Sequence, residues 1–297
     1  MGLMNEAVKG IKHPSLVTRF IYRQTIGGGG NPNGVSVFEQ DWDNLIILDA
    51  CRADAFSDVV APEIDGSMSI VESRGTATVE WIRRNFSGRE LADTVYVSAN
   101  GWLHRIQGEI RTTIHAADWL YTSRYRNEMG TVQPEVVAER ALTFANQYPN
   151  KRLIVHFVQP HKPFLGKTAE EHFAHAEGIN MDEMLRQAPE ATIGDLQAAY
   201  RETLEIALPS VKKLASRLNG KTIITSDHGE LLGERYPLLP FRNYGHPVGI
   251  YVPELTRVPW FECEWSDRRK IIEGEPRQPN QQATEELENH LRAMGYK

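Results

Sequence analysis

The sequence predicts an α/β fold: a doubly wound, mostly parallel sheet with helices on both faces. Short, continuous apolar runs are typical of parallel strands that are buried on both sides. These strands are expected near 44–49, 94–98, 153–158 and 221–226. Longer amphipathic segments alternate with the runs, which indicates strand–helix–strand units. The helices are expected near 134–147, 168–187 and 195–218.

Length and composition fit one catalytic domain with two appendages. A chain of 297 residues, 41% hydrophobic and 24% charged, can bury a full α/β core. We expect an N-terminal amphipathic arm at 1–35, a catalytic domain at 36–265, and a C-terminal tail with a short helix at 266–297. The arm mixes basic and apolar residues over 1–26. Peripheral membrane contact is one interpretation, and a helix packed on the domain or a frayed arm is the favoured one.

Charge and cysteine content restrict partners and compartment. The formal net charge of −6 gives no basic footprint for nucleic acid. Only Cys51 and Cys263 are present, which makes no disulfide framework and favours a reducing compartment. No apolar run has the length of a membrane span, and the N-terminus lacks a secretory signal pattern. The sequence predicts a cytoplasmic protein.

Two of the expected strands end on residues that bind cations. Asp49 follows the run at 44–48, and Asp227 and His228 follow the run at 221–224. The carboxyl ends of parallel strands meet at one edge of a sheet, so these side chains are expected to converge. Carboxylate oxygens and imidazole nitrogens together hold divalent ions. Taken alone, Asp227 could equally cap a following helix.

The order of several motifs carries a family resemblance. Residues 48–54 (LDACRAD) and 226–230 (SDHGE) resemble the two metal-ligand strands of the alkaline phosphatase superfamily, in its sulfatase-like branch. Weaker blocks follow the same order at 159–164, 245–246 and 257–260. The resemblance implies a divalent cation (Mn, Ca, Mg or Zn) held by Asp49, Asp227 and His228. Two-metal relatives have a further Asp-x-x-x-His element, which 171–175 matches poorly, so we expect one cation rather than two.

The resemblance places a nucleophile at the start of the helix after the first strand. Thr78 matches that place best and Thr76 second. A helix N-terminus presents unpaired N–H groups that hold an anionic group under attack. The alternative is that either threonine simply caps the helix.

The residues after Thr78 favour phosphate esters. Type I sulfatases have a Cys/Ser-x-Pro-x-Arg motif in which the Cys or Ser is oxidised. In this sequence Thr78 is followed by VEWI, so the Pro and the Arg of that motif are missing. We expect a metal-dependent hydrolase or phosphotransferase that forms a covalent phosphothreonine on a small-molecule, lipid or glycan ester. Sulfate ester hydrolysis is the enzymatic alternative. Since Ala50 stands where many relatives have a second acid, a catalytically inactive binding or assembly protein is the alternative of another class.

Further site residues follow from the weaker blocks. His161 and His246 are expected to act on the leaving-group side, as proton donors or by contacting the transferred group. His156, inside the run at 153–158, is expected to be a packed core histidine. Substrate contacts are expected from Arg52, Thr76 and Lys162.

Overall fold

The protein is described here by a computed structural model, which covers residues 30–122, 124–127, 130–174, 179–235, 241–275 and 285–295. Most of the predicted N-terminal arm, including the segment 1–26 proposed to contact membranes, lies outside these ranges. Among the described residues, no helix has both the length and the apolar character needed to cross a membrane.

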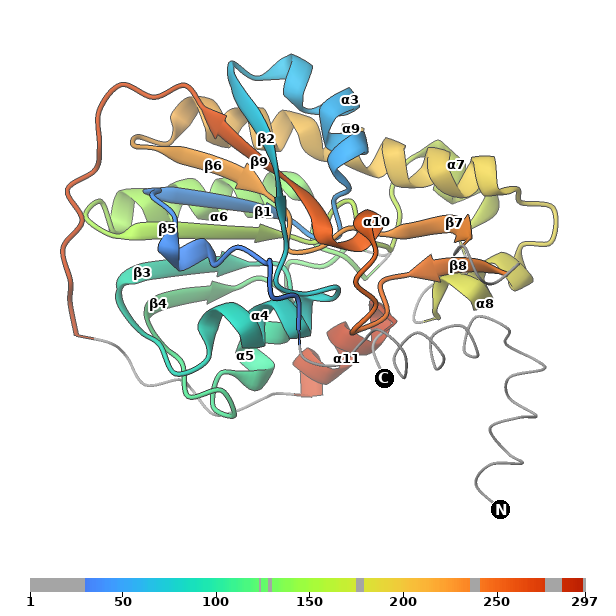
Figure 1. Cartoon of the computed structure of the whole chain (residues 1–297), viewed down its shortest axis with the longest axis horizontal. Helices are drawn as coiled ribbons and strands as arrows, with labels where there is room; N and C mark the ends of the chain where they lie inside the picture. Colours follow the sequence, from blue (N-terminus) through green and yellow to red (C-terminus); the bar gives the residue numbers. More distant parts are fainter. Residues whose placement is uncertain are drawn as a thin grey trace.

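A mostly parallel sheet forms the centre of the molecule, as predicted (Figure 1). Within the described residues it has seven strands in the order β2-β9-β6-β1-β5-β3-β4. Strand β9 is antiparallel to its neighbours β2 and β6. The strands are β1 (Asn44–Leu48), β2 (Gly66–Glu72), β3 (Glu90–Ser98), β4 (Thr113–Trp119), β5 (Arg152–Phe157), β6 (Thr222–Thr225) and β9 (Arg257–Cys263).

Helices surround this sheet, and a separate hairpin of β7 (Leu231–Arg235) and β8 (Arg242–Gly245) stands beside it (Figure 1). Helix α6 packs against β3, β5 and α9. The helices are α3 (Ala53–Val59), α4 (Thr78–Phe86), α5 (Trp102–Ile106), α6 (Pro134–Gln147), α7 (Lys167–His172), α8 (Met181–Gln187), α9 (Ile193–Arg217), α10 (Pro253–Thr256) and α11 (Glu285–Ala293), with short 3-10 turns at Val37–Glu39 and Ala61–Glu63.

The helix expected at 168–187 is two helices, α7 and α8. Helix α7 ends at His172, and α8 has its own N-cap, Asn180, whose side chain accepts a hydrogen bond from the backbone N–H of Glu183. A capping side chain satisfies a backbone donor that has no partner within the helix, so it marks a new helix start. Helix α9 also begins with a capping box, formed by Thr192 and Asp195.

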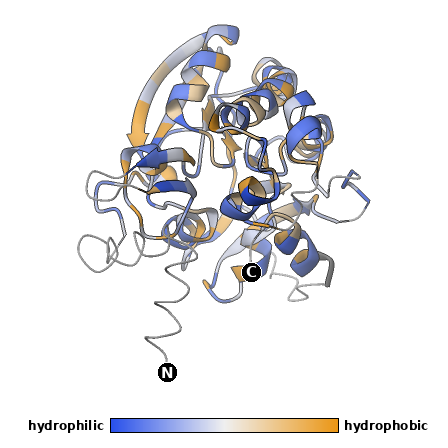
Figure 2. Cartoon of the chain, turned by 90° about the vertical axis from the view of Figure 1, so that its right-hand side faces the viewer, coloured by the Kyte–Doolittle hydropathy of each residue, from blue (hydrophilic) through white to orange (hydrophobic). Residues whose placement is uncertain are grey.

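The central strands form the core. Every residue of β1 is buried, which explains its continuous apolar sequence. Figure 2 shows that the surrounding helices carry both hydrophilic and hydrophobic stretches. The short C-terminal helix expected in the tail is α11; its Leu287 and Leu291, and Met294 just after it, belong to the main core cluster. This helix is therefore packed into the domain, although the boundary at 265 stays a prediction.

Candidate active site

Neighbouring strands bring the predicted cation ligands together. Strand β1 lies between β5 and β6 and is parallel to both. Asp49 follows the last residue of β1, and Asp227 follows β6 after one intervening residue. The two carboxylates therefore leave the same edge of the sheet from adjacent strands, which is where ligands bind in open α/β folds.

Four side-chain atoms from three segments converge at this edge. Oγ1 of Thr78 lies 3.2 Å from Nε2 of His228 and 3.4 Å from Oδ1 of Asp49. The same Nε2 lies 3.6 Å from Asp49 Oδ1 and 3.5 Å from Asp227 Oδ2. All four residues are fully buried. The structure thus brings together the three predicted ligands and the predicted nucleophile.

The spacing of these atoms fits a tetrahedral cation site. Nitrogen and oxygen ligands at about 2.0–2.2 Å from Zn²⁺ in a tetrahedron stand roughly 3.3 Å apart, close to the separations found here. Asp227 Oδ2 is buried and has no hydrogen-bond partner among the described residues. Burial and the charge of Asp227 raise the pKa of the Asp49 carboxyl. Two adjacent buried carboxylates need a positive counter-charge, which a divalent cation would supply.

Hydrogen bonds fix the orientation of each ligand. Asn100 donates from Nδ2 to Asp49 Oδ2 at 2.7 Å. The backbone N–H groups of Ala50 and His228 donate to Asp227 Oδ1 at 3.1 and 2.9 Å, which leaves Oδ2 to face the site. His228 Nδ1 donates to the carbonyl of Gly229 at 2.8 Å, so the lone pair of the neutral ring is on Nε2. Such outer contacts hold metal ligands in place.

Thr78 is the first residue of α4 rather than its N-cap. The N-cap is Ala77, and it makes no side-chain capping bond. The Thr78 hydroxyl is directed at Asp49 and His228 instead of at the backbone of its own helix. The capping alternative therefore does not describe Thr78.

A second cluster, consisting of His161, Glu230 and His246, lies beside the first. Its ligand-type atoms lie within 4.8 Å of one another, which is close enough to hold a cation. His246 Nδ1 lies 3.0 Å from Glu230 Oε1, and the His246 ring centroid is 4.5 Å from that of His228 and 5.0 Å from that of His161. The expectation of a single cation stays a prediction, and this cluster is where a second one would bind.

Glu230 is the site residue that the sequence reasoning missed. It stands in the 226–230 motif, and its side chain is fully buried. A buried carboxylate requires a partner, which His246 provides from 16 residues farther along the chain. Both residues lie in short motifs, Glu230 in 226–230 and His246 in 245–246, but the sequence does not indicate that the two side chains meet.

His161 is held as a neutral ring. Its Nδ1 donates to the carbonyl of Lys162 at 2.5 Å, which places the lone pair on Nε2. Burial, together with the nearby His246 and Lys162, holds its pKa well below the usual value. A neutral imidazole suits cation binding or hydrogen-bond acceptance better than proton donation at neutral pH.

His156 is both a core residue and a neighbour of the site. It is fully buried, as expected, and burial lowers its pKa to about 4. Its Nδ1 lies 2.7 Å from the Tyr96 hydroxyl, and its Nε2 lies 3.8 Å from Asp227 Oδ2. With Asp49 and Asp227 it forms a group whose ligand atoms lie within 4.8 Å. The only sequence feature that could have indicated a role for His156 at the site is that it is a histidine within an apolar strand.

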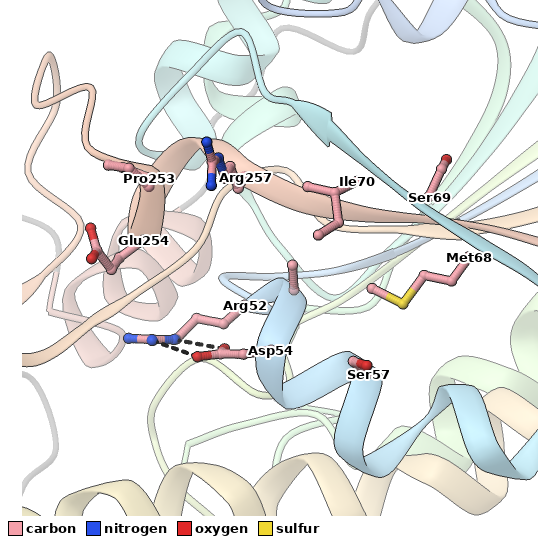
Figure 3. A pocket seen from close by; sticks show the side chains of 10 residues that line it. Arg52, Asp54, Ser57, Met68, Ser69, Ile70, Pro253, Glu254 and Arg257 are labelled. Atoms are coloured by element: carbon pink, nitrogen blue, oxygen red, sulfur yellow. Dashed lines mark hydrogen bonds and ion pairs between the residues drawn. The ribbon is translucent and has the colours of Figure 1, made fainter.

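All three expected substrate contacts have protein partners in this structure. Arg52 pairs with Asp54 at 2.6 Å and also with Glu234. It lines a surface cavity of about 670 Å³ that includes Met68 and Ile70 (Figure 3). Thr76 donates from Oγ1 to the carbonyl of Pro247 at 3.0 Å and accepts from the N–H of Gly249 at 2.9 Å, while its backbone N–H donates to Glu80. Substrate binding by Arg52 and Thr76 stays a prediction.

Lys162, the third expected contact, is 7% exposed. Its ammonium donates to the carbonyl of Met294, at the end of α11, at 2.7 Å. The structure therefore engages Lys162 with the residue that follows the C-terminal helix, and substrate binding by Lys162 stays a prediction.

Comparison with solved structures gives remote similarities. The chain is similar to the lipooligosaccharide phosphoethanolamine transferase EptA from Neisseria meningitidis (17% identity, 73% of this chain and 47% of that chain, TM-score 0.46). It is also similar to the C-terminal periplasmic domain of phosphoethanolamine transferase EptC from Campylobacter jejuni (17%, 74% and 77%, 0.48) and to a 2-O GAG sulfatase (12%, 86% and 70%, 0.49). The chain thus spans about half of the length of EptA.

No family model matches the chain, and the comparison with curated proteins gives no match. Among the solved structures to which the chain is similar are thus two phosphoethanolamine transferases and a sulfatase, at 12–17% identity.

Proposed function

We propose that the protein is a metal-dependent phosphate ester hydrolase or phosphotransferase in which Thr78 is the nucleophile. The observation that carries this proposal is the position of the buried Thr78 hydroxyl, 3.2 Å from His228 Nε2 and 3.4 Å from Asp49 Oδ1, with Asp227 Oδ2 3.5 Å from the same His228 nitrogen. A threonine used only for packing has no need of two carboxylates and an unprotonated imidazole nitrogen around its oxygen.

A divalent cation held by Asp49, Asp227 and His228 would lower the pKa of the Thr78 hydroxyl and balance negative charge on the ester. Asp49 Oδ1, which has a second lone pair, is the acceptor within reach of the hydroxyl proton, because the single lone pair of His228 Nε2 would bind the cation. The Thr78 oxygen bonds to phosphorus as the bond to the alcohol oxygen breaks. Water or an acceptor alcohol then attacks phosphorus, and the bond to Thr78 breaks.

The second cluster supports a role on the leaving-group side. His246 is the better-placed proton donor because the buried Glu230 carboxylate, 3.0 Å from its Nδ1, orients the ring. His161, a neutral ring with its lone pair on Nε2, is suited to contact the transferred group or a second cation. This division refines the expectation that either histidine donates the proton.

Phosphate is preferred to sulfate because an unmodified threonine cannot give the oxidised residue that type I sulfatases use. Ala50 supports the site through its backbone, because its N–H, presented by a left-handed backbone with φ of 61°, donates to Asp227 Oδ1. A small-molecule, lipid or glycan ester is the proposed substrate class. The cytoplasmic location, with or without membrane contact through residues 1–26, stays a prediction.

The test combines metal analysis with an ester panel. Purified wild-type protein should contain or bind a divalent cation and should hydrolyse or transfer phosphate mono- or diesters. Thr78→Ala should bind the same amount of metal and lose turnover, whereas Asp227→Asn should lose both. Turnover of sulfate esters alone would support the sulfatase alternative. Metal binding at other residues, without turnover of any ester, would support a binding or assembly protein.

A further inference from the structure

The C-terminal helix α11 touches two loops that carry site residues. At its end, the carbonyl of Met294 accepts a hydrogen bond from Lys162 Nζ at 2.7 Å. One turn earlier, His290 Nε2 lies 3.0 Å from the carbonyl of Ala99, to which it donates. Both His290 and Lys162 are buried. The helix therefore contacts Lys162, which follows His161 in the chain, and Ala99, which precedes Asn100.

The contact with Lys162 leads directly to His161. The carbonyl of Lys162 accepts the hydrogen bond from His161 Nδ1 at 2.5 Å, and the His161 backbone N–H donates to the carbonyls of Val158 and Asp49. Anchoring the Lys162 side chain thus fixes the peptide that sets the tautomer and direction of the His161 ring. Gly295 leaves room for this anchor, because a Cβ there would stand 2.4 Å from Lys162 Nζ.

The contact with Ala99 leads to Asp49. Ala99 precedes Asn100, whose Nδ2 donates to Asp49 Oδ2 at 2.7 Å and whose Oδ1 accepts from the N–H of Trp102 at 2.9 Å. The N–H of Ala99 donates to the carbonyl of His156 at 2.9 Å. Leu287 of α11 also lies against Gly101, where an added Cβ would stand 2.4 Å from its Cδ1. The helix therefore packs on the turn that orients a proposed cation ligand.

We propose that Lys162 and His290 are positioning residues through which the C-terminal helix sets the geometry of His161 and Asn100. The proposal rests on the function proposed above for this site. It assigns the C-terminal segment a part in catalysis, whereas core packing alone would make α11 only a stabilising element. Misplacing a catalytic group by about 1 Å costs about 10²-fold in rate, so loss of either contact should be measurable in kcat.

The chain offers a matched control for Lys162. Lys151 is also a buried lysine, 8% exposed, whose Nζ donates to the carbonyls of Ala92 and Ile272 at 2.9 and 2.7 Å. Neither carbonyl belongs to a loop that carries a site residue. Lys151→Met therefore removes the same kind of contact elsewhere, and it should lower thermal stability about as much as Lys162→Met does.

The experiment measures kcat, KM, metal content and melting temperature of the full chain with a phosphate ester, in Lys162→Met, His290→Leu and Lys151→Met. We expect kcat to fall about 10- to 100-fold in the first two variants, with metal content unchanged in Lys162→Met, and with both kcat and metal content unchanged in the control. His290→Gln, which keeps a donor for the Ala99 carbonyl, should recover much of the loss. Equal kcat in Lys162→Met and Lys151→Met would overturn the proposal.

Two further measurements keep the test decisive. If Lys162→Met does not fold, Gly295→Ala displaces the ammonium from the Met294 carbonyl and should lower kcat in the same way; unchanged kcat would overturn the proposal. If the wild type turns over no ester, the proposed function fails, and amide hydrogen exchange at His161 and Trp102 then tests positioning alone. Faster exchange in Lys162→Met and His290→Leu, and not in Lys151→Met, would uphold it, and unchanged exchange would overturn it.

Discussion

The Thr78 hydroxyl oxygen lies 3.2 Å from Nε2 of His228, although 150 residues separate the two in sequence. Thr78 starts helix α4, and His228 follows strand β6, so the contact depends on the fold of the whole domain. Because His228 Nδ1 donates to Gly229, the nitrogen that faces Thr78 carries a lone pair. This arrangement can take a proton from the hydroxyl or share a cation with it.

We predict that Asn100→Leu weakens cation binding. The substitution removes the 2.7 Å hydrogen bond that holds Asp49 Oδ2, and loss of such an outer contact typically lowers metal affinity about 10- to 100-fold. Titration of the metal-free protein with Zn²⁺ or Mn²⁺ measures the change. Asn85→Leu is the control, since Asn85 is equally buried but bonds Trp81 and Val37. Similar affinities in the two variants would contradict the prediction.

Thr76 should matter for structure rather than for nucleophilic attack. Its hydroxyl joins the start of α4 to the loop at Pro247 and Gly249, beside His246. Thr76→Val leaves buried partners without a hydrogen bond and should destabilise the protein by about 1–3 kcal/mol, while Thr76→Ser should retain stability and turnover. Denaturant unfolding and initial rates check both. Full stability of Thr76→Val together with complete loss of turnover would move the nucleophile to Thr76.

Loss of the His246–Glu230 pair should depend on the leaving group. If His246 protonates the departing alcohol, His246→Ala and Glu230→Gln should slow an alkyl phosphate much more than a nitrophenyl phosphate, whose leaving group needs little help. General-acid catalysis is typically worth about 10²–10⁴-fold, which a comparison of kcat/KM for the two esters can resolve. Equal losses on both esters would mean that the pair only binds the transferred group.

His290 should make the protein less stable in acid. Burial lowers the pKa of this residue to about 4, whereas in the unfolded chain it is about 6.5. As the pH falls from about 6.5 to 4, the unfolded state gains a proton that folded His290 does not, so stability is lost in that window and levels off below it. The free energy of unfolding falls by about 3 kcal/mol across this window. Unfolding of wild type and His290→Leu at pH 8 and pH 4.5 measures it.

The leucine variant should lose less stability on acidification than the wild type. His156, whose pKa burial also lowers to about 4, keeps its own share of the acid sensitivity in both proteins. If the wild type and His290→Leu lost the same free energy of unfolding between pH 8 and pH 4.5, the assignment to His290 would be contradicted.

The sequence predicted the centre of the fold and the first cluster for the same physical reason. Strands β1, β5 and β6 are buried on both faces, so they are continuous apolar runs, and the polar residues just after β1 and β6 stand out. Edge strand β2 was missed because it is largely exposed, with Ile70 58% exposed, and its sequence lacks such a run. Its partner β9 could not be paired with it from local pattern alone.

The remaining site contacts could not be predicted because they join distant segments. Lys162 meets Met294 across 132 residues, and no local pattern records that the C-terminal helix returns to the His161 loop. Lys162 beside a site histidine was therefore assigned to the substrate. Glu230 and His246 were each visible in short blocks, but only the fold brings the carboxylate and the imidazole within 3.0 Å.

The central claim is that Thr78 forms a covalent phosphothreonine beside a bound cation. The most direct test is to mix the metal-loaded protein with a phosphate ester, quench with denaturant and a chelator at neutral pH during turnover, and locate phosphate by peptide mass spectrometry. We expect phosphate on Thr78, dependent on the cation and absent from Asp227→Asn. Phosphate on Thr76 or on a histidine, or turnover that persists in Thr78→Ala, would contradict the claim.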